Sequence, residues 1–435
     1  MSYIHGGGYV FGDGNVDPWY FIDREEIVFV SFNYRLGSLG FAYSDHPSIN
    51  LSGNYGIKDQ IQALKWVQKT ISAFGGDPNN VSIIGVSAGG SSVHDLLLVP
   101  HETQGLIHKA ISVSGAALCP WAIQKRPNEN FLQLAKLNGC LEESAVEPNA
   151  EALECIKALD AETLATAWWP QLSNRYSLPF VFVPVENDGD IFKGTKEQIL
   201  SSGSFLQIPW LAGNARDEGS LIVGDSLSSQ SAMDYLSLNW QDLCPGVMDL
   251  SGIIDSAEVT RLCEEIAFHY MGNEQISFDN YYNYLQMGGD RLFEVPMQRS
   301  AILHSKFAPF YGYRYNYQSI ARSYLNYFNA GIPDDVPHLS SGVFHADNYA
   351  LIFNGGNFII PGDADEFVQN LHLGSLLNFI KTGVPTIPTN LVDYDLVWPT
   401  FSEDAPNIQV IDTFPRTTKN FVGKAEDEFW SSLGL

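Results

Sequence analysis

Residues 81–92 read Val-Ser-Ile-Ile-Gly-Val-Ser-Ala-Gly-Gly-Ser-Ser, and this stretch decides the fold class. The β-branched residues at its start predict a short strand, and the small residues after Ser87 open a predicted helix. A serine between glycines at a strand-to-helix turn is held on a tight bend that exposes its Oγ. Glycines are needed there because a Cβ would clash with the strand or the helix. Ser87 is therefore a candidate nucleophile, although the five residues alone also fit an ordinary Gly/Ser turn.

Strand and helix patterns alternate on both sides of this stretch. The predicted strands are 27–34, 81–84, 110–113, 209–212 and 311–317, and the predicted helices are 57–71, 91–98, 366–382 and 426–433. A Gly-rich turn is predicted at 36–40. The β-α-β-α-β order predicts an α/β fold with a mostly parallel sheet and helices on both faces. We expect a single domain over residues 1–435, with helical insertions at about 121–178 and 232–278.

The composition excludes several classes of partner. The 435 residues are 45% hydrophobic, and 24 Lys and Arg against 50 Asp and Glu give a net charge of -26. Such a charge opposes binding to nucleic acids and anionic membranes and favours neutral or cationic ligands. No apolar run approaches 18 residues, so we predict no membrane span. The sequence does not determine the oligomeric state.

The cysteines indicate an oxidising compartment. Cys140 and Cys155 bracket a polar, Glu-rich loop between two helical stretches, which suits a disulfide. The alternative is a scatter of buried thiols, and the odd count of five supports that for at least one cysteine. No Cys/His cluster has metal-ligand spacing, so we expect neither metal nor cofactor. Glycosylation sequons begin at Asn50 and Asn80, and both are short enough to arise by chance.

A serine nucleophile needs a base, a group that orients the base, and donors for the oxyanion. The upstream segment His5–Gly8 contains three consecutive glycines, whose N–H groups can approach a substrate oxygen closely; the alternative is a flexible turn. Glu218 follows the predicted strand 209–212, at the end of a strand where α/β active sites gather. Asp217 competes with Glu218 on chemistry alone.

Several of the ten histidines are candidates for the base. His345 lies in a late loop, Gly-Val-Phe-His-Ala-Asp, after the tyrosine-rich strand. His304 and His338 are also late in the chain. His94 lies one turn into the helix after Ser87, where a packed structural role is the better interpretation. These residues alone leave the choice of base open.

Seven segments together resemble the type-B carboxylesterase/cholinesterase family of α/β-hydrolases, and most of all insect carboxylesterases. They are His5–Gly12, Asn33–Gly37, Gly53–Gln60, Phe74–Val81, Gly85–Gly90, Asp217–Ser220 and Phe344–Asp347. The resemblance covers nearly the whole chain. It implies an α/β-hydrolase fold with helical insertions over the active site.

The resemblance also assigns roles to residues. It implies that Ser87 is the nucleophile, that His345 is the general base and acid, and that Glu218 orients His345. The other implied residues are Gly7, Gly8 and Ala88 as oxyanion donors, Leu178 and Phe180 in the acyl pocket, and Cys140 with Cys155 as a family disulfide.

The implied activity is hydrolysis of small-molecule carboxylic esters through an acyl-enzyme, in a protein that is secreted or in the secretory pathway. One departure is Val86, where the family usually has Glu, and this predicts slower turnover. We also expect the chain to lack the N-terminal portion of its relatives, which leaves the oxyanion loop on a four-residue stub with an unpaired strand edge. The competing hypothesis is a non-catalytic adhesion or ligand-binding protein on the same fold, or an inactive fragment.

Overall fold

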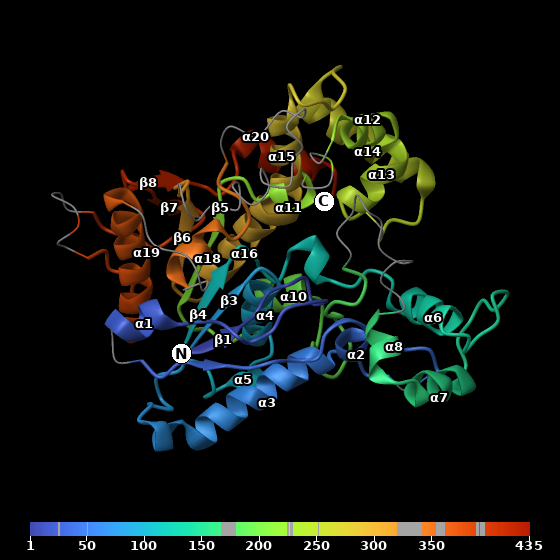
Figure 1. Ribbon diagram of the computed structural model, residues 1–435, viewed down its shortest axis with the longest axis horizontal. Coiled ribbons are helices and arrows are strands. Elements are labelled where there is room, and N and C mark those ends of the chain that lie inside the picture. The colour runs from blue at the N-terminus through green and yellow to red at the C-terminus, as the bar shows by residue number, and fades with distance from the viewer. Residues whose placement is uncertain are drawn as a thin grey trace.

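The computed structural model is built around one central sheet with helices on both faces (Figure 1). It describes residues 1–24, 27–49, 51–166, 180–223, 226, 229–250, 252–319, 342–353, 362–388, 391 and 396–435. Within these residues the sheet has eight strands in the order β2-β1-β3-β4-β5-β6-β7-β8, all parallel except β8, which runs antiparallel to β7. The strands are β1 Ser2–Ile4, β2 Val30–Ser31, β3 Ser82–Val86, β4 Lys109–Val113, β5 Trp210–Ala215, β6 Phe310–Tyr315, β7 Asn407–Ile411 and β8 Arg416–Lys419.

Helices connect and cover these strands. Those before β5 are α1 Trp19–Arg24, α2 Gly37–Phe41, α3 Tyr55–Thr70, η1 Ile71–Phe74, α4 Ala88–Leu97, α5 Pro100–Thr103, η2 Pro120–Ala122, α6 Pro127–Leu137, α7 Ala150–Ala158, α8 Ala161–Thr166 and α10 Lys196–Ser201. Those after β5 are α11 Ser220–Val223, α12 Gln230–Leu238, α13 Trp240–Val247, α14 Ser256–Met271, α15 Tyr281–Gly289, η4 Asp290–Glu294, α16 Val295–Ser305, α18 Asp347–Ile352, α19 Asp363–Thr382 and α20 Lys424–Ser432.

Both faces of the sheet are buried, because side chains alternate between two cores along each strand. Ile83 packs into the core that contains residues of α3, α4 and α16, and its neighbour Ile84 packs into the core that contains residues of α18 and α19. Phe310 and Tyr311 divide between the same two cores. Helices α3 and α19 flank the strands from different sides (Figure 1).

Most of the predicted central elements are confirmed. The strands predicted around 81–84, 110–113, 209–212 and 311–317 are β3, β4, β5 and β6, and the helix predicted over 57–71 is α3. Gly75, with a φ of 83°, ends the turn that extends α3, as its position in the sequence suggests.

Two predictions near the N-terminus are wrong. The apolar run 27–34 forms only the two-residue strand β2, because its neighbour β1 is three residues long and pairs only with Val30 and Ser31. The predicted turn at 36–40 is helix α2. Residues Ser2–Ile4 are paired on both sides, with β2 and with β3, so β2 rather than the stub forms this edge of the sheet.

Helical segments also lie where insertions were expected. Helices α6, α7 and α8 fall within 121–178; α13 and α14 fall within 232–278, and α12 begins two residues before that range. Residues 167–179 lie outside the described part of the chain. The division into one domain with two insertions stays a prediction.

Two disulfides lie in these helical segments. Cys140 and Cys155 are joined with their Cα atoms 5.6 Å apart, as expected. Cys244 and Cys263 join α13 to α14, and this second bridge was not predicted. Cys119 is a buried free thiol. Among the described residues, no helix combines the length and the apolar character that crossing a membrane requires.

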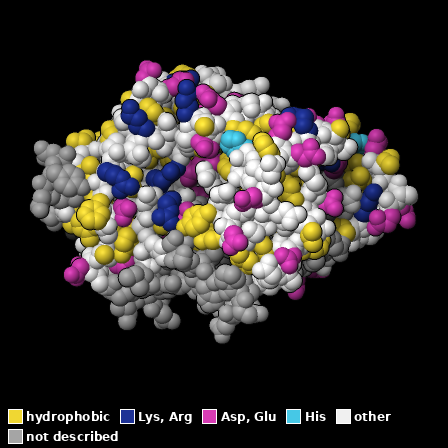
Figure 2. Space-filling view, turned by 90° about the horizontal axis from the view of Figure 1, so that it is seen from above, with side chains coloured by type: hydrophobic (Ala, Val, Ile, Leu, Met, Phe, Trp, Pro, Cys, Tyr) yellow, Lys and Arg dark blue, Asp and Glu magenta, His cyan; other side chains and the backbone are white. Residues whose placement is uncertain are grey.

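The surface carries the acidic excess of the sequence. Figure 2 shows acidic side chains spread over the face seen from above, while the basic side chains of this view gather mainly toward its left.

Candidate active site

The loops that follow several parallel strands meet around one pocket at the carboxyl edge of the sheet, as is usual for α/β folds. The pocket has a volume of about 620 Å³. Its lining includes Gly6, Gly7 and Gly8 after β1, Val86 and Ser87 at the end of β3, Ser220 and Leu221 after β5, and His345, Ala346 and Tyr349. Residues from segments that are distant in the sequence thus line one cavity.

Ser87 lies on a strained turn between β3 and α4. Its φ is 58° and its ψ is -123°, a conformation that residues with a side chain rarely adopt. Its N–H donates to the Val113 carbonyl at 2.7 Å, and its carbonyl accepts from the Ser91 N–H at 3.0 Å. A Cβ at Gly89 would lie 2.1 Å from the Ile4 oxygen. The glycine therefore allows the elbow to approach β1, as the sequence predicts.

The glycine loop after β1 presents backbone N–H groups to the pocket. Gly7 and Gly8 have φ values of 102° and 60°, which glycine adopts without steric cost. A Cβ on Gly8 would lie 1.9 Å from Cε1 of Phe180. The position of the Phe180 ring therefore also requires glycine at residue 8. No described residue accepts a hydrogen bond from the N–H of Gly7, Gly8 or Ala88. These groups are available to a ligand oxygen.

His345 and Glu218 are in direct contact. His345 Nδ1 lies 2.5 Å from Glu218 Oε2, and Glu218 Oε1 accepts the Ala215 N–H at 2.7 Å. The carboxylate is 1% exposed, and the histidine lines the pocket together with Ser87. When Nδ1–H donates to the carboxylate, Nε2 is the nitrogen that remains to accept a proton. The contact with Glu218 therefore determines which ring nitrogen of His345 can accept a proton.

Asp217, the competing acid, has a different set of contacts. Its Oδ2 accepts the Val343 N–H at 2.6 Å and pairs with Arg216 Nη2 at 2.7 Å. Its own N–H donates to the Val343 carbonyl at 2.9 Å. The structure thus brings Glu218 to the imidazole and uses Asp217 to anchor the segment before His345.

His94 and His304 do not line this pocket. His94 is buried in α4, accepts the Ala117 N–H at Nδ1 and stacks on Trp210 at 3.9 Å between ring centroids. Burial lowers the pKa of His94 well below its ordinary value and lowers the pKa of His304 to about 3. His338 lies outside the described residues. The packed role predicted for His94 is confirmed.

The pocket wall is mainly apolar. Of the two residues expected in the acyl pocket, Phe180 lines the cavity, and Leu178 lies outside the described residues. Val86 lines it as well, so the usual family carboxylate is replaced by an isopropyl group. Among the described lining residues, Asp13 alone carries a carboxylate. Nowhere in the described chain do three or more His, Cys, Asp or Glu side chains gather as a metal site would require.

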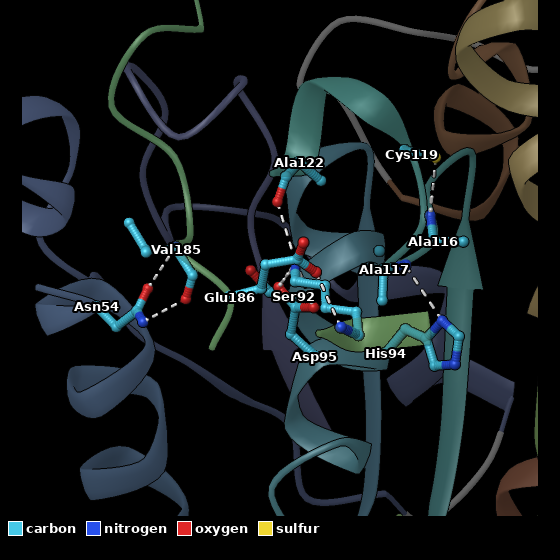
Figure 3. A network of polar contacts seen from close by, with 12 residues as sticks. Asn54, Ser92, His94, Asp95, Ala116, Ala117, Cys119, Ala122, Val185 and Glu186 are labelled. Atoms are coloured by element: carbon cyan, nitrogen blue, oxygen red, sulfur yellow. Dashed lines mark hydrogen bonds and ion pairs between the residues drawn. The ribbon is translucent and has the colours of Figure 1, made fainter. Parts of the chain in front are cut away.

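A buried ion pair fixes the helix that follows Ser87, and sequence reasoning missed it. Lys196 Nζ lies 2.7 Å from Asp95 Oδ1 on α4 and donates to the Ala122 carbonyl at 3.0 Å; both ionic side chains are fully buried (Figure 3). Nearby, the Asn54 amide bonds both backbone groups of Val185 (Figure 3). A single lysine in a sequence is expected on the surface, so no local signal identifies this pair.

Comparisons with known proteins find similar sequences over most of the chain. The family model described as "Carboxylesterase family" matches residues 1–430. The chain is 33% identical to Esterase E4 of Myzus persicae, over 88% of this chain and 68% of that protein. It is 31% identical to a carboxylic ester hydrolase of Bombus ignitus, over 94% and 71%. It is 28% identical to Venom carboxylesterase-6 of Apis mellifera, over 100% and 76%.

Proposed function

The chain belongs to the carboxylesterase family, and from that premise we propose that it hydrolyses carboxylic esters through an acyl-enzyme on Ser87. The contact that carries this proposal is His345 Nδ1 with Glu218 Oε2 at 2.5 Å, because it orients a base on the wall of the pocket that Ser87 also lines. In this scheme Ser87 is the nucleophile, His345 the general base and acid, and Glu218 the orienting acid.

The geometry supports a two-step reaction. His345 Nε2 takes the Ser87 proton as Oγ attacks the ester carbonyl, and then gives that proton to the departing alcohol. Water, deprotonated by the same nitrogen, next attacks the acyl carbonyl. The bond to Ser87 Oγ then breaks, Oγ takes back the proton from His345 Nε2, and the carboxylic acid is released. Glu218 stabilises the imidazolium that forms in both steps and keeps the ring in place.

Three N–H groups serve the oxyanion in this proposal. Those of Gly7, Gly8 and Ala88 have no acceptor among the described residues; Gly7 and Gly8 line the pocket, and Ala88 directly follows Ser87 at the start of α4. One such donor typically contributes about 10²–10³ in rate. Catalysis on this scheme proceeds through the chain's own side chains and backbone.

The pocket lining favours uncharged, largely apolar esters. Phe180, Val86 and Leu221 offer apolar surface, and Asp13, the one carboxylate among the lining residues that the structure describes, disfavours acidic substrates. The two disulfides support a protein of the secretory pathway, because such bonds persist in oxidising compartments. Glycosylation stays a prediction.

The direct test is labelling of Ser87 by a fluorophosphonate, with the modified peptide identified by mass spectrometry. We expect labelling of the wild type at neutral pH and none of Ser87→Ala, which should lose at least about 10³-fold in p-nitrophenyl butyrate hydrolysis. Ser91→Ala is the matched control, because this serine lies one turn into α4 and is fully buried. Folded wild-type protein that resists the probe would favour the non-catalytic alternative.

A further inference from the structure

A second cavity is lined by Glu218 and, among the described residues, shares no lining residue with the substrate pocket. Its volume is about 270 Å³, enough for several water molecules at about 30 Å³ each. Its ionisable lining groups are Arg216, Asp217, Glu218, Tyr282, Asp290, Glu294 and Arg314. Ser87 and His345 line the substrate pocket and not this cavity, whereas Glu218 lines this cavity and not the pocket. Glu218 therefore connects the two.

Glu294 is the deepest carboxylate of this second cavity that the proposed reaction leaves unused. It ends the π-helical turn η4 and is 4% exposed. Its Oε2 accepts from Arg314 Nη2 at 2.7 Å, and its Oε1 has no partner among the described residues. The preceding residue, Phe293, lies against the His345 ring at 5.0 Å between centroids. The same turn thus contacts His345 and lines the cavity behind Glu218.

Arg314 lines this cavity and belongs to β6, the strand beside β5. It pairs in register with Asn214, close to the Ala215 N–H that binds Glu218. Its Nη2 also donates to the Phe421 carbonyl, and its Nε has no partner among the described residues. Arg216 is already paired with Asp217. Arg314 therefore lines the cavity together with three carboxylates, those of Glu218, Asp290 and Glu294.

One positive charge does not balance three buried carboxylates. Burial raises the pKa of Glu294 to about 8, with Glu218 and Asp290 adding to the rise and Arg314 opposing it. Burial likewise raises the pKa of Asp290 to about 7, although Tyr270 donates a hydrogen bond to it at 2.8 Å. The crowding of carboxylates around one guanidinium and the raised pKa values thus both favour a protonated carboxyl group in this cluster.

We propose that Glu294 is a positioning residue for the ester hydrolysis, acting on His345 through Glu218 by setting the negative charge behind the triad. This inference rests on the proposed function. When Glu294 is ionised, a second carboxylate joins Glu218 in stabilising the imidazolium at His345. Its proton passes to solvent base through the cavity, whose wall includes the partly exposed Arg216.

The test is the pH dependence of kcat for p-nitrophenyl butyrate from about pH 6 to about pH 9.5. For the wild type we expect kcat to rise with pH, and the midpoint of this rise to lie near the pKa of Glu294, about 8. Coupling of about half to one pKa unit corresponds to a rise of about three- to tenfold. Glu294→Gln keeps the shape of the side chain and removes its charge, so this rise should disappear while KM stays within about twofold.

Two further variants separate an electrostatic role from a merely structural one. Arg314→Gln removes the cation that favours ionised Glu294, so the rise should move to higher pH. Asp290→Asn removes a carboxylate that disfavours ionisation, so the rise should move to lower pH. A structural role would instead lower kcat by one factor at every pH. A profile that keeps the rise at the same pH in Glu294→Gln would overturn the inference.

An infrared measurement checks the proton directly. The difference spectrum between wild type and Glu294→Gln should show a protonated carboxyl band at neutral pH that is lost in alkaline solution, and its absence would refute the inference. A wild type that neither labels with fluorophosphonate nor hydrolyses esters would reject the proposed function and this inference together. A wild type that does both, with an unchanged profile in Glu294→Gln, would reject the inference alone.

Discussion

Asp217 and Glu218 are adjacent in the chain, yet their carboxylates serve different partners. The first holds the backbone of Val343 and the guanidinium of Arg216, and the second contacts the imidazole of His345. Successive side chains after a strand point in different directions, so neighbours of equal chemistry reach different groups. The contacts of this acidic pair suggest that the two positions tolerate substitution very differently.

We expect Glu218→Gln to lower kcat by about 10³–10⁴, because an amide neither balances the imidazolium nor holds the required tautomer. Asp217→Asn keeps an oxygen that can accept the Val343 N–H and loses only the ion pair with Arg216, so its loss should stay below about tenfold. Measuring kcat of both variants on the same ester by steady-state kinetics compares the two losses. The reverse order of the two losses would assign the orienting role to Asp217.

The sequence identified candidate residues better than it identified their surroundings. Ser87 and the glycine loop stand out through spacing, whereas Glu218 and His345 were separated from their competitors only by a family resemblance. Glu294 and Arg314 gave no signal, because the π-helical turn that directs Glu294 inward has no sequence pattern that distinguishes it from an ordinary helix. The second disulfide was missed because nothing local indicates that α13 and α14 lie together.

At the scale of elements, α4 depends on a charge supplied from far away in the sequence. Lys196, the first residue of α10, is fully buried against Asp95 of α4. Breaking such a pair from one side leaves an uncompensated buried charge, which costs far more than the pair itself contributes. The pair therefore holds the position of the helix that begins at Ala88.

We expect Lys196→Met to lower the free energy of unfolding by about 3–5 kcal/mol, measured by urea denaturation. Lys58→Met is the matched control, because Lys58 pairs with Asp190 at 2.8 Å where both side chains are partly exposed, and it should cost about 0–1 kcal/mol. The double variant Asp95→Leu with Lys196→Met should recover most of the loss. Equal small effects at both lysines would contradict this account.

Elements with strong hydrophobic periodicity were predicted well, and short or edge elements were not. The four central strands β3 to β6 carry apolar runs because both faces are covered. In contrast, β2 is only two residues long, because the neighbouring strand β1 is too short to pair with more of the apolar run. Strands β7 and β8 were not predicted. Strand length at an edge is set by the neighbouring strand, which local sequence does not encode.

For the whole molecule, surface charge and two buried carboxylates act on stability in the same direction above about pH 7, where buried histidines such as His94 and His304 are neutral in both the folded and the unfolded state. The net charge of -26 repels itself increasingly as pH rises from the pI of about 4.6. The pKa of Asp290 rises from 3.8 to about 7 on folding, and that of Glu294 from 4.5 to about 8. At a pH between the unfolded and the folded pKa of each group, the folded state holds a proton that the unfolded chain has lost. The contribution of these two groups to stability therefore falls as pH rises.

We expect the urea midpoint to fall between about pH 7 and about pH 8, where the two carboxylates still titrate and the buried histidines no longer do. Added salt should reduce the contribution of the exposed charges and leave that of the buried carboxylates. The double variant Asp290→Asn with Glu294→Gln should flatten the dependence that remains in high salt. A midpoint in high salt that is independent of pH in the wild type would show that these two groups titrate normally.

The family expected from the sequence is confirmed by the match over residues 1–430, and so is the α/β class. The roles of Ser87, Glu218 and His345 remain proposals with defined tests. What the sequence could not supply is the relation between distant segments, such as η4 against the loop after β5, because it arises only when the tertiary structure forms.

The wide separation of the pocket loops along the chain has a consequence for refolding. Residues near positions 7, 87, 218 and 345 come together only when β1 and β3 to β6 have taken their places in the sheet. Pairings between such remote segments form slowly, since long stretches of chain must be closed before they contribute. Recovery of esterase activity after dilution from denaturant should consequently lag behind the return of helical circular dichroism, so that turnover serves as a reporter of the last stage of assembly.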